Sequence, residues 1–167
     1  PTRRSSDLLV KAFNNIRRPQ WFTLARHLGL PERILQPWHK FLASFTRRFQ
    51  VHNHLSKPLT SDIGFAEGDP LSVPAMAVLD WALHVYQSQY APMTRTMSFV
   101  DNISMMSRFV MNLVWAFFSL RSFLDLWGLE IDIHKSYTWS TLPQTRAELA
   151  PLGIQVVEDI SELGGSL

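Results

Sequence analysis

The longest apolar segment of this sequence is the feature that most restricts the folds open to it. Between residues 107 and 127, large apolar side chains recur at steps of three or four, and Gly128 follows directly. The apolar run at 109–120 includes Asn112 and is too short to cross a bilayer as a helix. We therefore expect a long core helix here and no membrane partner. Because the N-terminus lacks the apolar region of a signal peptide, we also expect an intracellular protein.

Shorter helix and strand patterns alternate along the rest of the chain. Helical spacing and capping residues predict helices over 20–28 and 32–45, and a third that begins at Asp69-Pro70. Short extended segments predict strands, which are 8–13, 49–55, 96–100, 103–105, 129–133 and 152–157. The order lacks the regular rhythm of a doubly wound sheet. It favours an α+β domain with a small antiparallel sheet backed by helices.

Composition narrows the class of protein further. With 167 residues, 46% of them apolar and 18% charged, the chain is long enough for one domain with a packed core. It contains no cysteine, which excludes disulfide frameworks, thiolate zinc sites and cysteine nucleophiles. A net charge of +2 and a pI near 9.3 permit nucleic-acid contact but do not argue for it alone.

The first candidate for chemistry is Asp101-Asn102, which lies between two predicted strands. A carboxylate at such a turn projects from the sheet edge, where a divalent cation such as Mg²⁺ could bind it and bridge to phosphates. Asp-Asn is also ordinary hairpin-turn chemistry. This segment alone leaves a metal ligand and a plain turn both open.

The second candidate is the segment 64–72, in which two glycines precede a helix start. Gly64 and Gly68 permit a close approach of the backbone to a neighbouring group. Asp69 can accept hydrogen bonds from the free N–H groups of the first helical turn, and Pro70 suits its first position. A helix N-terminus could bind an anion or a nucleotide. An ordinary loop before a capped helix is the alternative.

Basic side chains form a third group of candidates. Lys135 follows the predicted strand 129–133, where it could reach phosphate oxygens or donate a proton to a leaving pyrophosphate. The doublets Arg17-Arg18 and Arg47-Arg48 are consistent with phosphate contacts. A solvated surface position is the alternative in each case.

Taken in order, five segments resemble the palm motifs of a reverse transcriptase of the non-LTR retroelement or group II intron type. Residues 9–14 are similar to its first motif, an Asp followed by three variable residues and Ala-Phe-Asp, and 64–72 to its second, Gly-x-x-Gln-Gly-x-Pro-Leu-Ser. Residues 98–102 stand where the family has Tyr-Ala-Asp-Asp. The last two matches are 128–136, a Gly-Leu strand followed by Lys-Ser, and 152–154. The resemblance covers nearly the whole chain and rests on order and spacing together.

This resemblance implies a role for each matching residue. Asp101 would hold the two Mg²⁺ (or Mn²⁺) ions of the intact enzyme, and Lys135 would be the proton donor near the triphosphate. Phe13 would be the steric gate that rejects a ribose 2′-hydroxyl. The remaining members of the nucleotide site would be Gly68, Asp69, Pro70 and Asn102.

The resemblance also implies partners and an architecture. The intact enzyme would copy an RNA template onto a DNA primer, using deoxynucleoside triphosphates. Residues 9–167 would form a partial palm with an inserted helical segment at about 20–46. Most of the fingers and thumb of the same polypeptide would be missing. The cellular compartment would be the nucleus for a eukaryotic retroelement and is otherwise open.

Three positions depart from the family pattern. Glu67 replaces a Gln, and Asn102 replaces the second Asp of the third motif. The first-motif Asp should lie five residues before Phe13, where this sequence has Leu8. Asp7 is one residue out of register, which on a strand turns the side chain to the opposite face. We therefore expect this chain to be inactive as written.

The first eight residues offer a simple origin for that departure. Residues 1–8 resemble the in-frame translation of a widely used sequencing adapter that ends inside the codon for residue 8. On this interpretation, residues 1–7 and the identity of Leu8 are not biological. The rival interpretation is a decayed retroelement copy that has lost its aspartate.

Two other functions stay open at this point. A non-catalytic nucleic-acid-binding domain could keep the palm fold without the missing carboxylate. An RNA-dependent RNA polymerase is the weaker alternative, because Phe13 at the gate position speaks against it.

Overall fold

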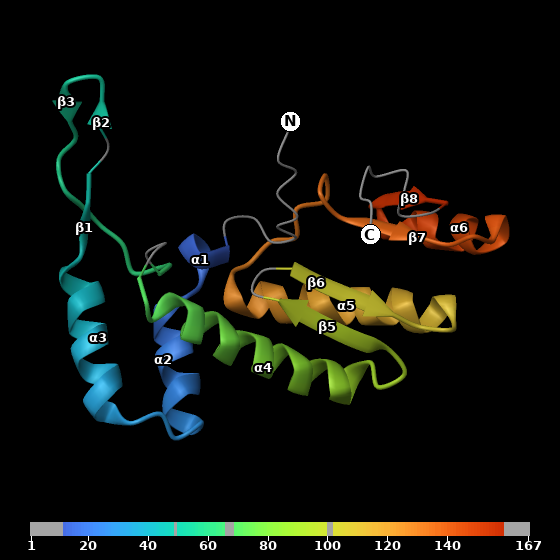
Figure 1. Cartoon of the computed structure of the whole chain (residues 1–167), viewed down its shortest axis with the longest axis horizontal. Helices are drawn as coiled ribbons and strands as arrows, with labels where there is room; N and C mark the ends of the chain where they lie inside the picture. Colours follow the sequence, from blue (N-terminus) through green and yellow to red (C-terminus); the bar gives the residue numbers. More distant parts are fainter. Residues whose placement is uncertain (1–11, 49, 66–68, 100–101, 159–167) are drawn as a thin grey trace. The chain divides into compact units, whose positions relative to one another are not determined.

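The computed structural model describes residues 12–48, 50–65, 69–99 and 102–158, which divide into two compact units (Figure 1). The N-terminal unit comprises Lys11–Val78, and the C-terminal unit begins at Leu79. The boundary falls within helix α4 (Ser72–Tyr90). No helix among the described residues is both long and apolar enough to span a membrane.

Helices followed by short strands make up the described part of the N-terminal unit. Before α4 its elements are α1 (Ala12–Asn15), α2 (Arg18–His27), α3 (Glu32–Ser44), β1 (Thr46–Arg47), β2 (Gln50–Val51), β3 (His54–Leu55) and β4 (Leu59–Thr60). The helices predicted at 20–28 and 32–45 are confirmed as α2 and α3. The strand predicted at 8–13 is wrong at its end, because Ala12–Asn15 is helical. Residues 8–11 of that predicted strand lie outside the described residues.

Four buried aromatic rings pack together in the core of the N-terminal unit. Trp21 lies edge-on to Phe22, Trp38 and Phe65, with ring centroids 5.3, 5.1 and 5.4 Å away. Trp38 stacks on Phe65 at 4.9 Å and 17°. The buried indole Nε1 of Trp21 also donates a 2.9 Å hydrogen bond to the carbonyl of Ala75 in the first turns of α4. Such edge-to-face pairs each add about 0.5–1.5 kcal/mol beyond area burial, so this cluster holds α2, α3 and the start of α4 together.

A narrow β ribbon follows α3 (Figure 1). β1 pairs with β4 and β2 pairs with β3, both antiparallel. The strand predicted at 49–55 is therefore two short strands, because His52, at φ 53°, and Asn53 form a tight turn between them.

The C-terminal unit contains a β hairpin, two long helices and a small parallel pair of strands. Its elements after α4 are β5 (Arg95–Phe99), β6 (Asn102–Met106), α5 (Val110–Trp127), β7 (Tyr137–Trp139), α6 (Pro143–Leu149), the 3₁₀ helix η1 (Ala150–Leu152) and β8 (Gln155–Val157). The helix predicted at 107–127 is confirmed as α5, and Gly128 ends it in the left-handed conformation at φ 69°.

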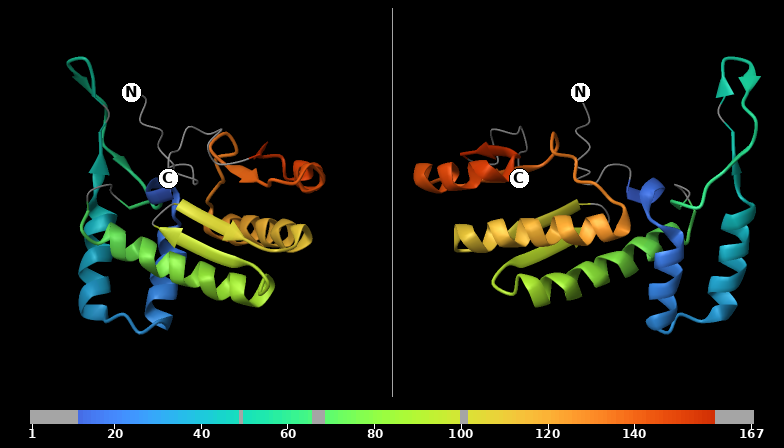
Figure 2. Two further views of the ribbon diagram at one scale, coloured as in Figure 1. Left: turned by 45° about the vertical axis from the view of Figure 1, so that its right-hand side comes forward. Right: turned by 180° about the vertical axis from the view of Figure 1, so that it is seen from behind.

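The β5–β6 hairpin packs on α4 and α5, as the two views in Figure 2 show. His84 Nε2 of α4 and Ser98 Oγ of β5 are hydrogen-bonded at 2.9 Å. Gln87 Nε2 of α4 donates to the carbonyl of Ala116 in α5 at 3.3 Å. The strands predicted at 96–100 and 103–105 are thus confirmed as an antiparallel pair backed by helices.

The last two strands differ from the single antiparallel sheet that the sequence predicts. β7 and β8 are parallel, with Tyr137 opposite Gln155 and Trp139 opposite Val157. The reason is the connection: α6 and η1 form a crossover, and a helical crossover returns the chain in the same direction. Phe117 of α5 packs against this crossover, so the mixed α+β class holds while the β content is a set of two-stranded ladders in the described residues.

The strand predicted at 129–133 is wrong. Only Ile131 in it has the geometry of a β-bridge, and residues 133–135 form a turn. Asp132 causes this turn: its Oδ1 accepts a hydrogen bond from the N–H of His134 at 3.1 Å, and its carbonyl accepts from the N–H groups of Lys135 and Ser136. An aspartate that bonds the backbone two residues on stabilises a turn against an extended strand.

Candidate functional site

The candidate residues are distributed over both units. Phe13, Asp69 and Pro70 belong to the N-terminal unit, and Asn102 and Lys135 belong to the C-terminal unit. Two further candidates, Gly68 and Asp101, lie outside the described residues, as do Leu8 and Glu67 at the departing positions.

In the N-terminal unit, the first and second candidate motifs lie side by side. The N–H of Phe65 donates to the carbonyl of Phe13 at 2.5 Å, and the N–H of Gly64 donates to the carbonyl of Ile16 at 2.8 Å. Gly64 has φ +74° and directly faces the backbone of Asn14, where a Cβ would overlap it. The close backbone approach expected of this glycine is confirmed, and its neighbour is the backbone of the same chain.

Asp69 uses both carboxylate oxygens inside the N-terminal unit. Its Oδ1 accepts a 3.0 Å hydrogen bond from the N–H of Leu71, and its Oδ2 accepts a 2.9 Å bond from the indole Nε1 of Trp38. Its carbonyl accepts from the N–H of Ser72, where α4 begins. The helix start predicted at Asp69-Pro70 is confirmed, with the first helical residue of α4 at Ser72. In this geometry Asp69 orders the loop and the helix entrance, the capping alternative of the sequence analysis.

A basic candidate, Arg18, is buried, which the sequence did not indicate, and it supports the same loop. Arg18 is 6% exposed, and its Nε donates to the carbonyl of Gly64. Its Nη1 donates to the carbonyls of Leu42 and Ser61 at 3.0 and 2.7 Å. The expected phosphate role is therefore wrong for Arg18, because its donors are already engaged. No local pattern separates it from the exposed Arg17, since its partners lie 24 to 46 residues away.

In the C-terminal unit, Asn102 is the first residue of β6 and pairs directly with Phe99. β6 therefore begins at the second residue of the Asp101-Asn102 turn that the sequence predicts, and Val100 and Asp101 lie outside the described residues. Asn102 is half-buried at the end of the ladder.

Lys135 lies in the turn before β7 rather than directly after a strand. Its side chain is 42% exposed, and its Nζ is 3.8 Å from Asp132 Oδ2. Exposed pairs of this kind contribute at most about 1 kcal/mol, so the ammonium can exchange this partner for a phosphate at little cost.

The donor set does not fit two divalent ions in this chain as written. Among the described residues there is no group of three or more His, Asp or Glu side chains that could hold a metal. The sequence provides Asp101, with Asn102 beside it and Leu8 at the first-motif position. One carboxylate offers too few oxygen ligands for a pair of Mg²⁺ ions.

Comparisons with known proteins give no family for the chain. No model of a known protein family matches it, and a search of curated proteins finds no match.

Proposed function

We propose that this chain is a palm fragment of a retroelement reverse transcriptase whose parent is an RNA-directed DNA polymerase. The observation that carries the proposal is the β5–β6 hairpin. Its strands β5 and β6 are antiparallel and backed by helices, and Asp101 stands between them in the sequence. That is the setting in which the resemblance requires a carboxylate.

The neighbouring first and second motifs add support. Phe65 and Phe13 are hydrogen-bonded through their backbones although they lie far apart in the sequence. Two segments with separate roles at one nucleotide site have to meet in the fold. Their contact agrees with the proposal and involves only residues within the N-terminal unit.

The parent reaction is a nucleotidyl transfer. The 3′-hydroxyl of a DNA primer attacks the α-phosphate of a deoxynucleoside triphosphate, the new phosphodiester bond forms, and pyrophosphate leaves. Lys135, on an exposed turn, would donate a proton to that leaving group. Phe13 would exclude a 2′-hydroxyl. We assign this reaction to the parent, since the chain as written lacks the first-motif carboxylate.

Primer extension tests the proposal. Leu8→Asp is made in the complete polypeptide with its fingers and thumb, and extension of a DNA primer on an RNA template is measured with Mg²⁺ and deoxynucleotides. We expect extension with Leu8→Asp and none with the original Leu8. Leu8→Asp combined with Asp101→Asn is the matched control and should be inactive.

The second candidate function is a non-catalytic nucleic-acid-binding domain, or a decayed copy of the enzyme. Leu8 favours it, because that residue cannot bind a metal. Salt-dependent RNA binding without extension by the Leu8→Asp polypeptide would establish this candidate in place of the polymerase. Either protein would act inside the cell, and in the nucleus for a eukaryotic retroelement.

A further inference from the structure

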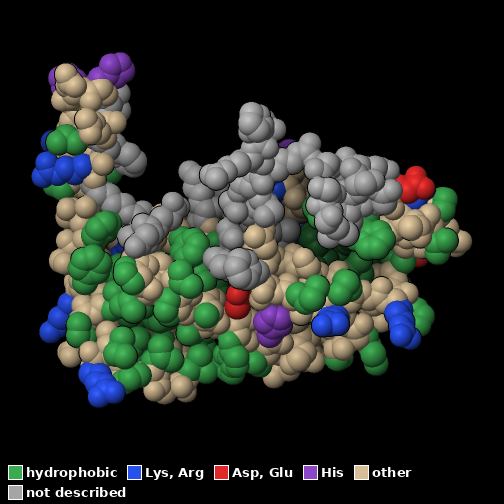
Figure 3. Space-filling view, in the orientation of Figure 1, with side chains coloured by type: hydrophobic (Ala, Val, Ile, Leu, Met, Phe, Trp, Pro, Cys, Tyr) green, Lys and Arg blue, Asp and Glu red, His purple; other side chains and the backbone are tan. Residues whose placement is uncertain are grey.

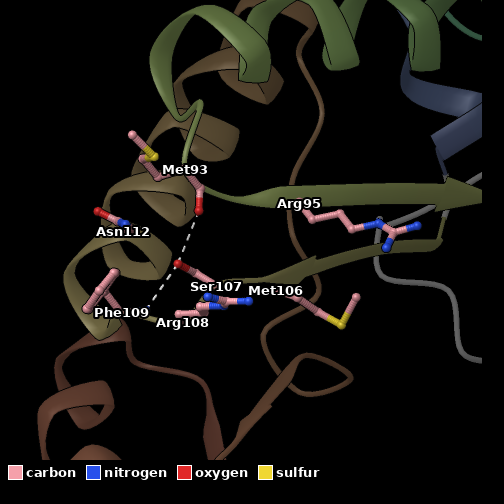
Figure 4. A pocket seen from close by; sticks show the side chains of 7 residues that line it. All are labelled: Met93, Arg95, Met106, Ser107, Arg108, Phe109 and Asn112. Atoms are coloured by element: carbon pink, nitrogen blue, oxygen red, sulfur yellow. Dashed lines mark hydrogen bonds between the residues drawn. The ribbon is translucent and has the colours of Figure 1, made fainter.

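A groove with two arginines lies at the end of the β5–β6 hairpin opposite the connection of residues 100 and 101. It has a volume of about 420 Å³ and lies between the start of β5, the end of β6 and the start of α5 (Figure 4). A second hollow of about 190 Å³ adjoins it and shares Met93 and Asn112. The larger volume lies in the range of about 300–1,000 Å³ that holds small molecules or parts of larger ligands.

The floor of this arginine groove is ordered by Ser107. Its hydroxyl donates to the carbonyl of Met93 at 3.3 Å and accepts from the N–H of Phe109 at 3.3 Å. These bonds tie the loop before β5 to the segment that enters α5, as Figure 4 shows. The groove is thus a feature of packed elements, and its shape does not depend on exposed side chains alone.

The charge of the groove is positive. Arg95 and Arg108 both line it, both are exposed, and neither forms an ion pair with a described carboxylate. No described Asp or Glu lines the groove, and the face drawn in Figure 3 shows few acidic side chains among the described residues. The groove therefore suits an anionic occupant.

The remaining lining side chains are apolar and unusually open to solvent. Phe109 is 68% exposed and Met93 is 75% exposed, while Met106 lies beside Arg108. Asn112 adds an amide that can donate and accept hydrogen bonds at the same wall. An occupant that fits must carry negative charge and flat apolar groups at short intervals.

We propose that the arginine groove binds a single-stranded segment of nucleic acid, with Arg95 and Arg108 on its phosphates and Phe109 against a base. The inference rests on the proposed function and names a surface for the template or the primer outside the reaction centre. Each nucleotide of a single strand carries one phosphate and one flat base, which matches a groove lined by both cations and exposed apolar side chains. An acidic peptide matches the charge but has no regular flat group for Phe109.

The test is fluorescence anisotropy with the 167-residue chain and labelled single-stranded RNA or DNA of about 10 nucleotides. The groove variants are Phe109→Ala and the double variant Arg95→Ala with Arg108→Ala. The controls are Arg121→Ala and Leu126→Ala, two exposed positions of α5 that do not line the groove. All of these residues are exposed, so circular dichroism should show each variant folded like the parent.

We expect Phe109→Ala to weaken binding about tenfold, as loss of one base-stacking contact does. The double arginine variant should weaken it further and lower the slope of log K against log salt by about 1.4, which is two single-strand phosphate contacts. The two controls should bind like the unmodified chain.

Three results would overturn the inference, and they differ in what they say of the proposed function. If the groove variants bind as tightly as the unmodified chain, the groove is not the binding site, although the chain still binds nucleic acid. If the unmodified chain does not bind, the groove proposal fails. Primer extension by the Leu8→Asp polypeptide then tests the proposed function separately. Tighter binding of a Glu- and Leu-rich peptide through the same residues would make the groove a protein-docking surface.

Discussion

Trp38 and Asp69 are joined by a 2.9 Å hydrogen bond from the indole Nε1 to the carboxylate Oδ2, and this bond links α3 to the entrance of α4. The indole is 6% exposed. The other carboxylate oxygen accepts from the N–H of Leu71. Asp69 therefore satisfies a buried donor and a helix-entrance donor at once, which makes it central to the folding of the N-terminal unit.

We predict that Asp69→Ala lowers the free energy of unfolding by about 2–4 kcal/mol. About 1 kcal/mol comes from the lost cap and about 1–3 kcal/mol from the buried indole N–H left without its acceptor. Urea unfolding measures this difference. Trp38→Phe removes the donor, so Asp69→Ala should cost less in that background. Additive effects of the two substitutions would show that the bond contributes nothing.

Gly64→Ala should destabilise the protein far more than Gly29→Ala. Both glycines have positive φ, +74° and +80°, which costs an alanine about 1–2 kcal/mol. A Cβ at Gly29 meets open space, whereas one at Gly64 overlaps the backbone of Asn14. We expect Gly29→Ala to lower the free energy of unfolding by about 1–2 kcal/mol. Gly64→Ala should lower it by more than about 4 kcal/mol or abolish folding. Equal melting temperatures for the two variants would contradict this close contact.

Arg18→Lys should lower stability, and Arg17→Lys should not. The Arg18 guanidinium donates from Nε to the carbonyl of Gly64 and from Nη1 to the carbonyls of Leu42 and Ser61, a planar geometry that one ammonium cannot reproduce. We expect a loss of about 2–4 kcal/mol for Arg18→Lys, since bonds to a charged donor are each worth about 1.5–3 kcal/mol. Arg17 is exposed, so its substitution should change stability by less than about 0.5 kcal/mol. Guanidinium chloride unfolding curves of the two variants provide the comparison.

Lys135→Ala separates stability from catalysis. Among the described residues its side chain pairs with Asp132, 3.8 Å away on the surface, so stability should change by less than about 1 kcal/mol. In the Leu8→Asp polypeptide, loss of a general acid should lower kcat of primer extension about 10²-fold or more, with little change in KM. Asp132→Asn, which keeps an oxygen for the turn, should leave kcat nearly unchanged. An unaltered kcat for Lys135→Ala would remove this lysine from the reaction.

Helix α5 should make the isolated chain self-associate. One face packs in the core through Phe117, Leu120 and Leu124, while the other exposes a stripe of apolar residues, Met111, Trp115, Phe118 and Leu126. Globular proteins seldom leave such a stripe uncovered. Sedimentation velocity should show association that increases with concentration, and Phe118→Glu with Leu126→Lys should reduce it. A monodisperse monomer at high concentration would be the opposite result.

Several elements were predictable because their signals are local. Periodic apolar residues before Gly128 predict α5, and the capping chemistry of Asp69 predicts the start of α4. The paired strands β5 and β6 follow from two short extended segments around one tight connection. The expectation failed at 129–133, where the apolar alternation was outweighed by the backbone bonds of Asp132.

The amino-acid sequence by itself determined where α2, α3, α4, α5 and the β5–β6 hairpin form and which residue types stand at the proposed site. Only the tertiary structure decided that Arg18 is buried, that Gly64 faces Asn14 and that β7 and β8 run parallel. The physical reason is the distance along the chain between the residues that interact. Caps, turns and periodicity depend on neighbours within one or two turns of chain. The partners of a buried guanidinium, a close backbone contact and a strand direction depend on segments that meet only after folding.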